Sequence, residues 1–140
     1  MLIIGAGWIG RQVGLRMAIC GLEVGLIDRV PSVSQAAQQW MQAAAPGYIE
    51  AILAHVARRD SAAPAAHAAA GLVPITRQLS EAWEERVAFD PSPESLGDKI
   101  QVVLECVPEQ ITLKRRILRE FSRRFPKTTI IASNSSYFTP

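Results

Sequence analysis

The sequence begins with a short apolar run that leads directly into a glycine-rich segment. Residues 1–4 read Met-Leu-Ile-Ile, and the next six are Gly5-Ala6-Gly7-Trp8-Ile9-Gly10. A buried strand, a glycine turn and a helix in this order are typical of the phosphate-binding part of a dinucleotide-binding βαβ unit. We therefore predict that a strand ends near Gly5 and that a helix begins near Trp8.

Each glycine of this segment has its own predicted role. Gly5 makes the tight turn, Gly7 lets the backbone approach a pyrophosphate, and Gly10 lets the helix pack closely on the strand. The phosphates are expected at the positive end of the helix, where the first N–H groups have no partner within the helix. The other residues of this turn that we expect at the cofactor are Ala6, Trp8 and Ile9.

A second apolar run, residues 22–27, ends at an acid. Asp28 lies 18 residues beyond Gly10, close to the spacing of the carboxylate that binds the adenosine ribose. A carboxylate there repels a 2′-phosphate and so favours NAD over NADP, whereas Arg29 directly after it can accept a 2′-phosphate. An ordinary βαβ unit with incidental glycines is the less favoured alternative.

Composition limits the class of protein. The chain has 140 residues, 49% of them hydrophobic and 20% charged, which fits one globular domain. The net charge of +2 gives no argument for nucleic acid as a partner. Seven Lys or Arg residues and one acid, Glu120, fall within residues 114–127, and we interpret this segment as a solvated helix face.

The cysteines and the N-terminus indicate a reducing compartment. Cys20 and Cys106 both lie in apolar surroundings, so we predict small buried hydrophobic residues rather than a disulfide or a metal site. The apolar N-terminal run reaches glycine after four residues and has no basic segment before it, unlike a signal peptide or a membrane span. We expect a cytoplasmic protein without a membrane partner.

Helical and strand patterns alternate along the rest of the chain. A helix from Pro31, a break at Pro46-Gly47 and a second helix over residues 48–58 predict a helical hairpin after the second strand. Residues 61–71 are expected to form a loop or a weak helix. The remaining predicted elements are helices at 76–86, near 93–97 and from Pro108, with Glu109 in its first turn, and strands at 86–89, 101–107 and 128–132. We predict the α/β class, a Rossmann-type doubly wound parallel sheet in the order 3-2-1-4-5.

Polar residues follow the last two predicted strands, at the edge of the sheet where ligands bind. Val107-Pro108-Glu109 follows the fourth strand, and Ser133–Ser136, here called the Ser turn, follows the fifth. Hydroxyl groups in the Ser turn can bond a substrate oxygen or a nicotinamide, or they can simply cap a turn. The residues alone leave both interpretations open.

Three segments together resemble the NAD-binding domain of the L-3-hydroxyacyl-CoA dehydrogenases, including the lambda-crystallin or L-gulonate 3-dehydrogenase branch. They are LIIGAGWIG at 2–10, ECVPEQITLKRRIL at 105–118 and TTIIASNSSYFTP at 128–140. The resemblance covers nearly the whole chain. It implies an oxidoreductase of fatty acid metabolism that oxidises a secondary alcohol by hydride transfer to NAD.

The resemblance also implies roles for individual residues. Gly5, Gly7 and Gly10 frame the pyrophosphate, and Asp28 binds the adenosine ribose with Arg29 beside it. Ser136 contacts the reacting oxygen of the substrate and the nicotinamide region. The further residues implied near the cofactor are Val107, Glu109, Lys114 and Asn134.

The sequence departs from the family after the Ser turn. The family's catalytic His and the helical domain that closes the substrate cleft and forms most homodimer contacts follow that turn, whereas this sequence ends at Pro140. His55 and His67 fall outside the catalytic motif. We therefore expect residues 1–140 to be an NAD-binding domain that is inactive alone. The alternative is a stand-alone dinucleotide-binding module or a truncated remnant without turnover.

The substrate class stays open between a 3-hydroxyacyl-CoA and a small 3-hydroxy acid. Residues 31–57 contain no Lys or Arg, whereas the acyl-CoA enzymes offer Lys contacts to CoA from the corresponding helix. Glu105-Cys106-Val107-Pro108-Glu109 resembles the lambda-crystallin branch more closely, and that branch acts on smaller polar hydroxy acids.

Overall fold

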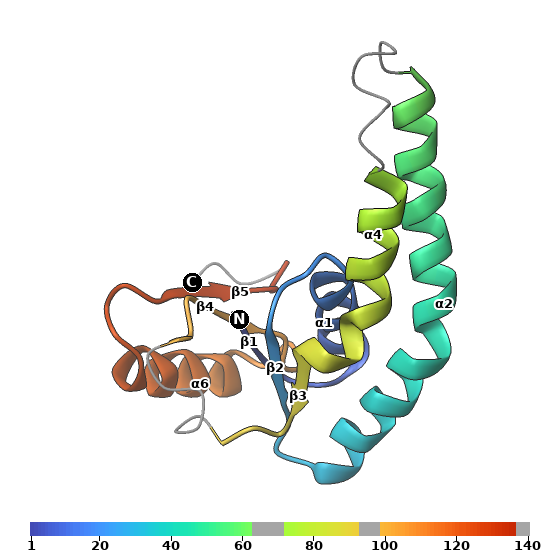
Figure 1. The fold of residues 1–140 in the computed structure, drawn as a ribbon. Coiled ribbons are helices and arrows are strands. Elements are labelled where there is room, and N and C mark those ends of the chain that lie inside the picture. The colour runs from blue at the N-terminus through green and yellow to red at the C-terminus, as the bar shows by residue number, and fades with distance from the viewer. Residues whose placement is uncertain (63–71, 93–98, 137–140) are drawn as a thin grey trace.

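The computed structural model describes residues 1–62, 72–92 and 99–136. These residues form a five-stranded parallel sheet in the order β3-β2-β1-β4-β5 with helices on both faces (Figure 1). This confirms the predicted fold class and strand order. The strands are β1 (Leu2–Ile4), β2 (Val24–Ile27), β3 (Val87–Phe89), β4 (Val102–Glu105) and β5 (Ile130–Ser133).

Two apolar layers cover the central strands. α1 (Trp8–Ile19) packs on the face that contains Ile3 and Leu26, which are neighbours across β1 and β2. α6 (Ile111–Arg124) packs on the opposite face, where Leu2 and Val103 are neighbours across β1 and β4. Because the central strands are covered on both faces, their residues are almost all apolar.

The helical hairpin after β2 is present, but its two arms differ from the prediction. α2 (Pro31–Ala62) is one continuous helix that passes through Pro46, so the predicted break at Pro46-Gly47 is wrong. Pro46 has no backbone N–H, so the helix lacks the hydrogen bond to the carbonyl of Gln42. Gln42, Pro46 and Gly47 are all exposed, so water can reach that carbonyl group instead. α2 contacts α1 and α4 (Leu72–Glu81), and its residues Met41 and Leu53, on either side of Pro46, are buried.

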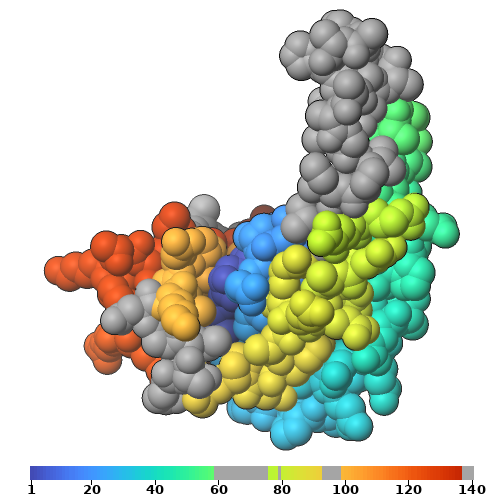
Figure 2. Space-filling model, viewed as in Figure 1, coloured from blue at the N-terminus to red at the C-terminus, as the bar shows by residue number. Residues whose placement is uncertain are grey.

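The second arm of the hairpin is α4, which packs along α2. α4 is followed by the short 3-10 helix η1 (Ala82–Arg86), in which Trp83 is buried. The sequence predicts one helix over residues 76–86 here, whereas the structure has the end of α4 and then η1. In the space-filling view, α4, η1 and β3 lie between β2 and α2 (Figure 2). The predicted short helix near 93–97 and most of the predicted loop at 61–71 lie outside the described residues.

Two smaller predictions are also corrected. α6 begins at Ile111, so Glu109 lies in the turn before the helix rather than in its first turn. Cys20 is exposed rather than buried, because it caps the C-terminus of α1 where the chain turns at Gly21 with a φ of 92°. Among the described residues, no helix is long and apolar enough to span a membrane.

Candidate functional site

A cleft of about 1110 Å³ opens at the carboxyl ends of β1, β2 and β4. The glycine turn, the segment after β2 and the start of α6 form its walls. Most of the predicted site residues line it, namely Gly5, Gly7, Trp8, Ile9, Asp28, Arg29, Val107, Glu109, Lys114 and Asn134. The fold therefore brings residues from both ends of the chain to one site.

The three glycines of the turn have the geometry that their predicted roles need. Gly5 has a φ of 102°, and a Cβ there would lie 2.7 Å from the carbonyl oxygen of Cys106. A Cβ on Gly10 would lie 1.8 Å from the carbonyl oxygen of Gly5, so only glycine lets α1 approach β1 this closely. A Cβ on Gly7 would meet nothing within 4 Å, and Gly7 lines the open cleft.

The N-terminus of α1 is suited to an anion. Gly7 is the N-cap, so no side chain caps the helix, and the first turn contains no acidic residue. The first N–H groups of such a helix and the positive end of its dipole bind phosphate. The open space at Gly7 and the uncapped helix end fit the pyrophosphate of a dinucleotide.

Asp28 braces the turn from the end of β2. Its Oδ2 accepts a hydrogen bond from the backbone N–H of Ala6 at 2.9 Å, and its Oδ1 accepts one from Val30 at 2.9 Å. The backbone N–H of Asp28 donates to Oδ1 of Asp90 at 3.1 Å, and the Ser34 hydroxyl donates to the same oxygen at 2.7 Å. Because the Asp28 carboxylate has further lone pairs and lines the cleft, it can also accept bonds from ribose hydroxyls.

A buried ion pair ties β4 to α6 beside the cleft. The Glu105 side chain is 0% exposed and the Lys114 side chain 4% exposed, and Lys114 Nζ lies 2.9 Å from both carboxylate oxygens. The same ammonium lies 3.2 Å from Glu109 Oε2 and donates to the Val107 carbonyl at 3.3 Å. Lys114 therefore has three protein acceptor groups for its three N–H bonds.

The charge state of Lys114 follows from these contacts. Burial lowers the pKa of Lys114, but the hydrogen bonds to Glu105 and Glu109 more than offset this, so that its net pKa is raised. Lys114 is consequently protonated at neutral pH, and its single positive charge faces two carboxylates at the edge of the cleft, those of Glu105 and Glu109.

The Ser turn is held by the same network. The Ser133 hydroxyl donates to Glu105 Oε2 at 2.6 Å and accepts a bond from the backbone N–H of Ser135 at 3.1 Å. The Ser135 hydroxyl donates to Glu109. The two acids that neighbour Lys114 thus also fix the turn that ends at Ser136.

Three predicted site residues do not line the cleft. Ala6 is buried and takes part through its bond to Asp28, and Gly10 is buried where α1 crosses β1. Ser136 is exposed at the end of the Ser turn.

The sequence interpretation misses two residues that build the site, Glu105 and Asp90. Glu105 is a lone acid in a strand predicted to be covered on both faces, and such an acid is the signal for a buried ion pair. From the sequence, Asp90 is interpreted only as a turn residue. In the structure it has a φ of 47°, and its carboxylate accepts hydrogen bonds from the Ser34 hydroxyl and the backbone N–H of Asp28.

Cys106 lines the cleft as a protonated thiol. Burial raises its pKa to about 11, and the negative charge of Glu105 adds to the rise. Since the thiolate is the reactive form, this environment makes Cys106 a poor nucleophile at neutral pH.

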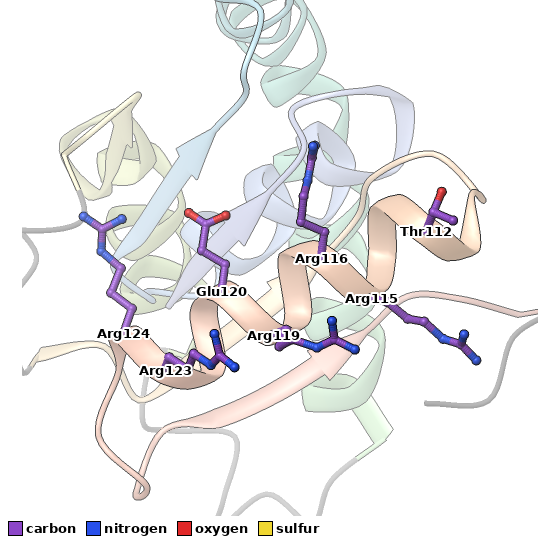
Figure 3. A pocket seen from close by; sticks show the side chains of 7 residues that line it. All are labelled: Thr112, Arg115, Arg116, Arg119, Glu120, Arg123 and Arg124. Carbon is purple, nitrogen blue, oxygen red and sulfur yellow. The ribbon is translucent and has the colours of Figure 1, made fainter.

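A second groove, of about 660 Å³, lies along an exposed side of α6 (Figure 3). It is lined by Thr112, Arg115, Arg116, Arg119, Glu120, Arg123 and Arg124, all of them exposed. The inner side of α6 buries Lys114 and Phe121 instead. The basic segment therefore forms an exposed helix face as predicted, except for Lys114, which is buried in the ion pair with Glu105.

Neither a histidine nor a metal cluster is found at the described part of the site. His55 is exposed on α2 and is not among the residues that line the cleft. Among the described residues, no group of three or more His, Cys, Asp or Glu side chains is placed to hold a metal ion. His67 lies outside the described residues.

Known proteins that resemble this chain in sequence or fold include two dehydrogenases and a diketoreductase. L-carnitine dehydrogenase of Mesorhizobium japonicum is 25% identical over 138 residues, which are 99% of this chain and 30% of that protein. The (S)-3-hydroxybutyryl-CoA dehydrogenase of Ralstonia eutropha superposes with a TM-score of 0.69 at 22% identity, over 99% of this chain and 41% of that one. A diketoreductase superposes with a TM-score of 0.65 at 24% identity, over 99% of this chain and 42% of that one.

The chain thus spans less than half the length of these relatives. Residues 1–140 match the family described as 3-hydroxyacyl-CoA dehydrogenase, NAD binding domain. Since the match covers the whole chain and the glycine turn fits a dinucleotide, the protein belongs to the 3-hydroxyacyl-CoA dehydrogenase family as its NAD-binding domain.

Proposed function

We propose that the cleft holds NAD(H) along the carboxyl edge of the sheet. The observation that carries this proposal is the pairing of Gly7 at the uncapped start of α1 with Asp28 in the same cleft. Backbone N–H groups at Trp8 and Ile9 bind the pyrophosphate. The Asp28 carboxylate accepts hydrogen bonds from the ribose hydroxyls, and Arg29 lines the cleft beside it.

The nicotinamide end of the cofactor lies toward the β4–α6–β5 side. Val107, Glu109 and Asn134 line the cleft there, and Glu109 is held by Lys114 and Ser135. Lys114 acts on the cofactor through Glu109 and the backbone of Val107, because its N–H bonds are directed at protein acceptors. Ser136 is the hydroxyl that bonds the reacting oxygen of the substrate.

The reaction that we propose for the whole protein is the oxidation of a secondary alcohol in a 3-hydroxyacyl-CoA or a small 3-hydroxy acid. NAD, when bound, accepts the hydride from the carbinol carbon. Ser136 orients the hydroxyl group, and a general base must take its proton. In the family that the sequence resembles, this base is a histidine in the segment after the Ser turn, and we propose the same for this protein. An acyl-CoA substrate would place the reaction in fatty acid metabolism.

Titration with NADH by calorimetry tests the cofactor site. We expect saturable binding to the 140-residue chain, and we expect Gly7→Trp to abolish it by filling the space above the turn. Gly47→Trp is the matched control, because a Cβ on Gly47 also meets nothing within 4 Å, Gly47 has no positive φ, and it is exposed on α2 away from the cleft. Absence of binding at millimolar NADH would refute the proposal.

A dinucleotide-binding module without turnover is the second candidate, and the absence of histidine from the described cleft lining favours it for the chain alone. Loss of a general base removes about 10²–10⁴-fold in rate. An NADH-linked assay with acetoacetyl-CoA and with L-gulonate at high protein concentration distinguishes the two candidates. Turnover above that of Ser136→Ala would show that residues 1–140 contain a complete active site.

We also propose a reducing, cytoplasmic location and assembly of the whole protein as a homodimer. Both cysteines are free thiols, which supports the first point. Sedimentation of the 140-residue chain, which we expect to be monomeric or weakly associated, tests whether dimer contacts lie within these residues.

A further inference from the structure

The contact between α1 and α2 contains two arginines that lie over aromatic rings. The Arg11 guanidinium carbon is 4.9 Å from the centre of the Trp8 ring and 4.6 Å from that of Trp40. The Arg16 guanidinium carbon is 5.1 Å from the centre of the Tyr48 ring. We call these five residues the Arg–Trp seam.

In the part of the chain that the structure describes, no carboxylate pairs with the positive charge of the seam. Within residues 1–62, 72–92 and 99–136, neither Arg11 nor Arg16 forms an ion pair. The Nε of Arg11 is buried and has no hydrogen-bond partner there. The Arg11 guanidinium is therefore held by cation–π contacts, and its terminal N–H groups remain for a ligand.

The seam adjoins the cofactor cleft without forming part of its lining, apart from Trp8. Trp8 lines the cleft and is 64% exposed, whereas Arg11 and Trp40 are half-buried behind it. Because residues 31–57 of α2 contain no Lys or Arg, the cation that faces the aromatic side of α2 comes from α1. A ligand bound at Arg11 would thus lie beside the dinucleotide.

We propose that the Arg–Trp seam binds an oxyanion of the substrate. Arg11 is the cation that bonds the oxyanion, and the rings of Trp8 and Trp40 orient the Arg11 guanidinium. A planar guanidinium donates two parallel hydrogen bonds to a carboxylate or a phosphate, and stacking on a ring leaves the donors at its edge accessible. The oxyanion is the carboxylate of a free hydroxy acid or a phosphate of an acyl carrier. That this ligand is the substrate rests on the function proposed above.

Nitrogen-15 NMR of the 140-residue chain tests the site even where binding is weak. The three tryptophans give three indole N–H signals, and Trp83, which is only 5% exposed, is an internal reference. One series is titrated with 3-hydroxybutyrate, a second with coenzyme A and a third with NADH. We expect one of the first two to shift the Trp40 indole and the Arg11 Nε–H signals saturably, while Trp83 stays in place.

Variants separate this site from a general attraction of anions. We expect Arg11→Met to weaken binding about tenfold or more, and Arg11→Lys to weaken it less, because Lys keeps the charge but lacks the planar fork. Arg119→Met removes an exposed arginine of α6 and is the matched control, with no expected change. Circular dichroism verifies that each variant is folded.

The outcomes identify the ligand or overturn the proposal. Shifts with 3-hydroxybutyrate assign a carboxylate, and shifts with coenzyme A assign a phosphate. If neither shifts Arg11 at millimolar concentrations while NADH still binds, this proposal is wrong and the cofactor site stands. If Arg11→Met lowers the affinity for NADH itself, Arg11 serves the dinucleotide and the proposal is again wrong. Failure of the unaltered chain to bind NADH refutes the proposed function instead.

Discussion

The two halves of the cofactor site keep their shape by different means. In the β1–α1–β2 half, the site is mostly backbone, and glycines keep side chains out of the turn and the helix contact. In the β4–α6–β5 half, the site is built on a buried charge network, with Glu105 and Lys114 at its centre. One half depends on missing side chains and the other on paired ones.

This difference determines how each half fails. An added methyl group at Gly5 or Gly10 collides with backbone atoms, and at Gly10 the helix must move away from the strand. A removed charge in the second half leaves its partner buried without compensation, and that penalty far exceeds the net value of the pair. The charge network therefore contains the positions where one substitution costs most.

The largest expected effect is that of Lys114→Met. It leaves the Glu105 carboxylate buried without a cation, and we expect the free energy of unfolding to fall by about 3–5 kcal/mol. Arg123→Met on the exposed side of the same helix is the control, with an expected change within about 0.5 kcal/mol. Urea unfolding measures both, and a loss below about 1 kcal/mol for Lys114→Met would contradict the network. The double variant Glu105→Leu with Lys114→Met should recover most of the loss.

The same difference explains what the sequence predicts. The strand, turn and helix of the glycine half are predicted correctly, because their signals are local: an apolar run, three glycines and an acid at fixed spacing. The role of Glu105 is not predicted, because its partners lie on α6 and after β5, and only the fold brings them together. The resemblance supplies Lys114 and Glu109 as site residues, but it does not show that Lys114 is buried in an ion pair.

The α2 helix shows a second limit of local signals. Pro46-Gly47 is a strong local signal for a helix end, yet α2 continues through it. Packing against α1 and α4 outweighs the loss of one backbone hydrogen bond at an exposed position. The hairpin is predicted correctly as a feature, and its turn is placed wrongly.

The next largest effect is that of Gly10→Ala. Its methyl group would lie 1.8 Å from the carbonyl oxygen of Gly5, so α1 must shift, and we expect a loss of about 3 kcal/mol in unfolding free energy. Gly7→Ala is the matched comparison, because its methyl group meets nothing within 4 Å. We expect Gly7→Ala to retain stability and to weaken NADH binding. Equal stability of the two variants would contradict the roles assigned here, Gly10 in the contact of α1 with β1 and Gly7 in the space for the cofactor.

A smaller effect is expected for Asp28→Asn, now on binding. The amide keeps one acceptor for the turn but loses the charge that strengthens bonds from the ribose, so NADH affinity should fall by about 1.5–2 kcal/mol, roughly 10-fold to 30-fold. NADPH affinity should fall less or rise, because the carboxylate no longer repels a 2′-phosphate. Competition calorimetry with both cofactors measures this. An unchanged ratio of the two affinities would show that Asp28 acts on the turn alone.

The smallest effect concerns stability in alkaline solution. The pKa of Cys106 is about 11 in the folded chain, well above the value of about 8.5 for a free thiol, so the unfolded thiol ionises first and stability falls as pH rises between them. The raised pKa of Lys114 stabilises the fold at lower pH, and this contribution is lost as pH rises above about 10.4, the pKa of a free lysine, because the unfolded ammonium deprotonates before the folded one. Cys106→Ala should therefore move the onset of alkaline unfolding from near pH 9 to above pH 10, whereas Cys20→Ala, at an exposed position, should leave it in place. Urea midpoints measured from pH 7 to 11 follow the stability of both variants. If the onset of alkaline unfolding does not respond to Cys106→Ala, the loss of stability comes from Lys114 and the charge network alone.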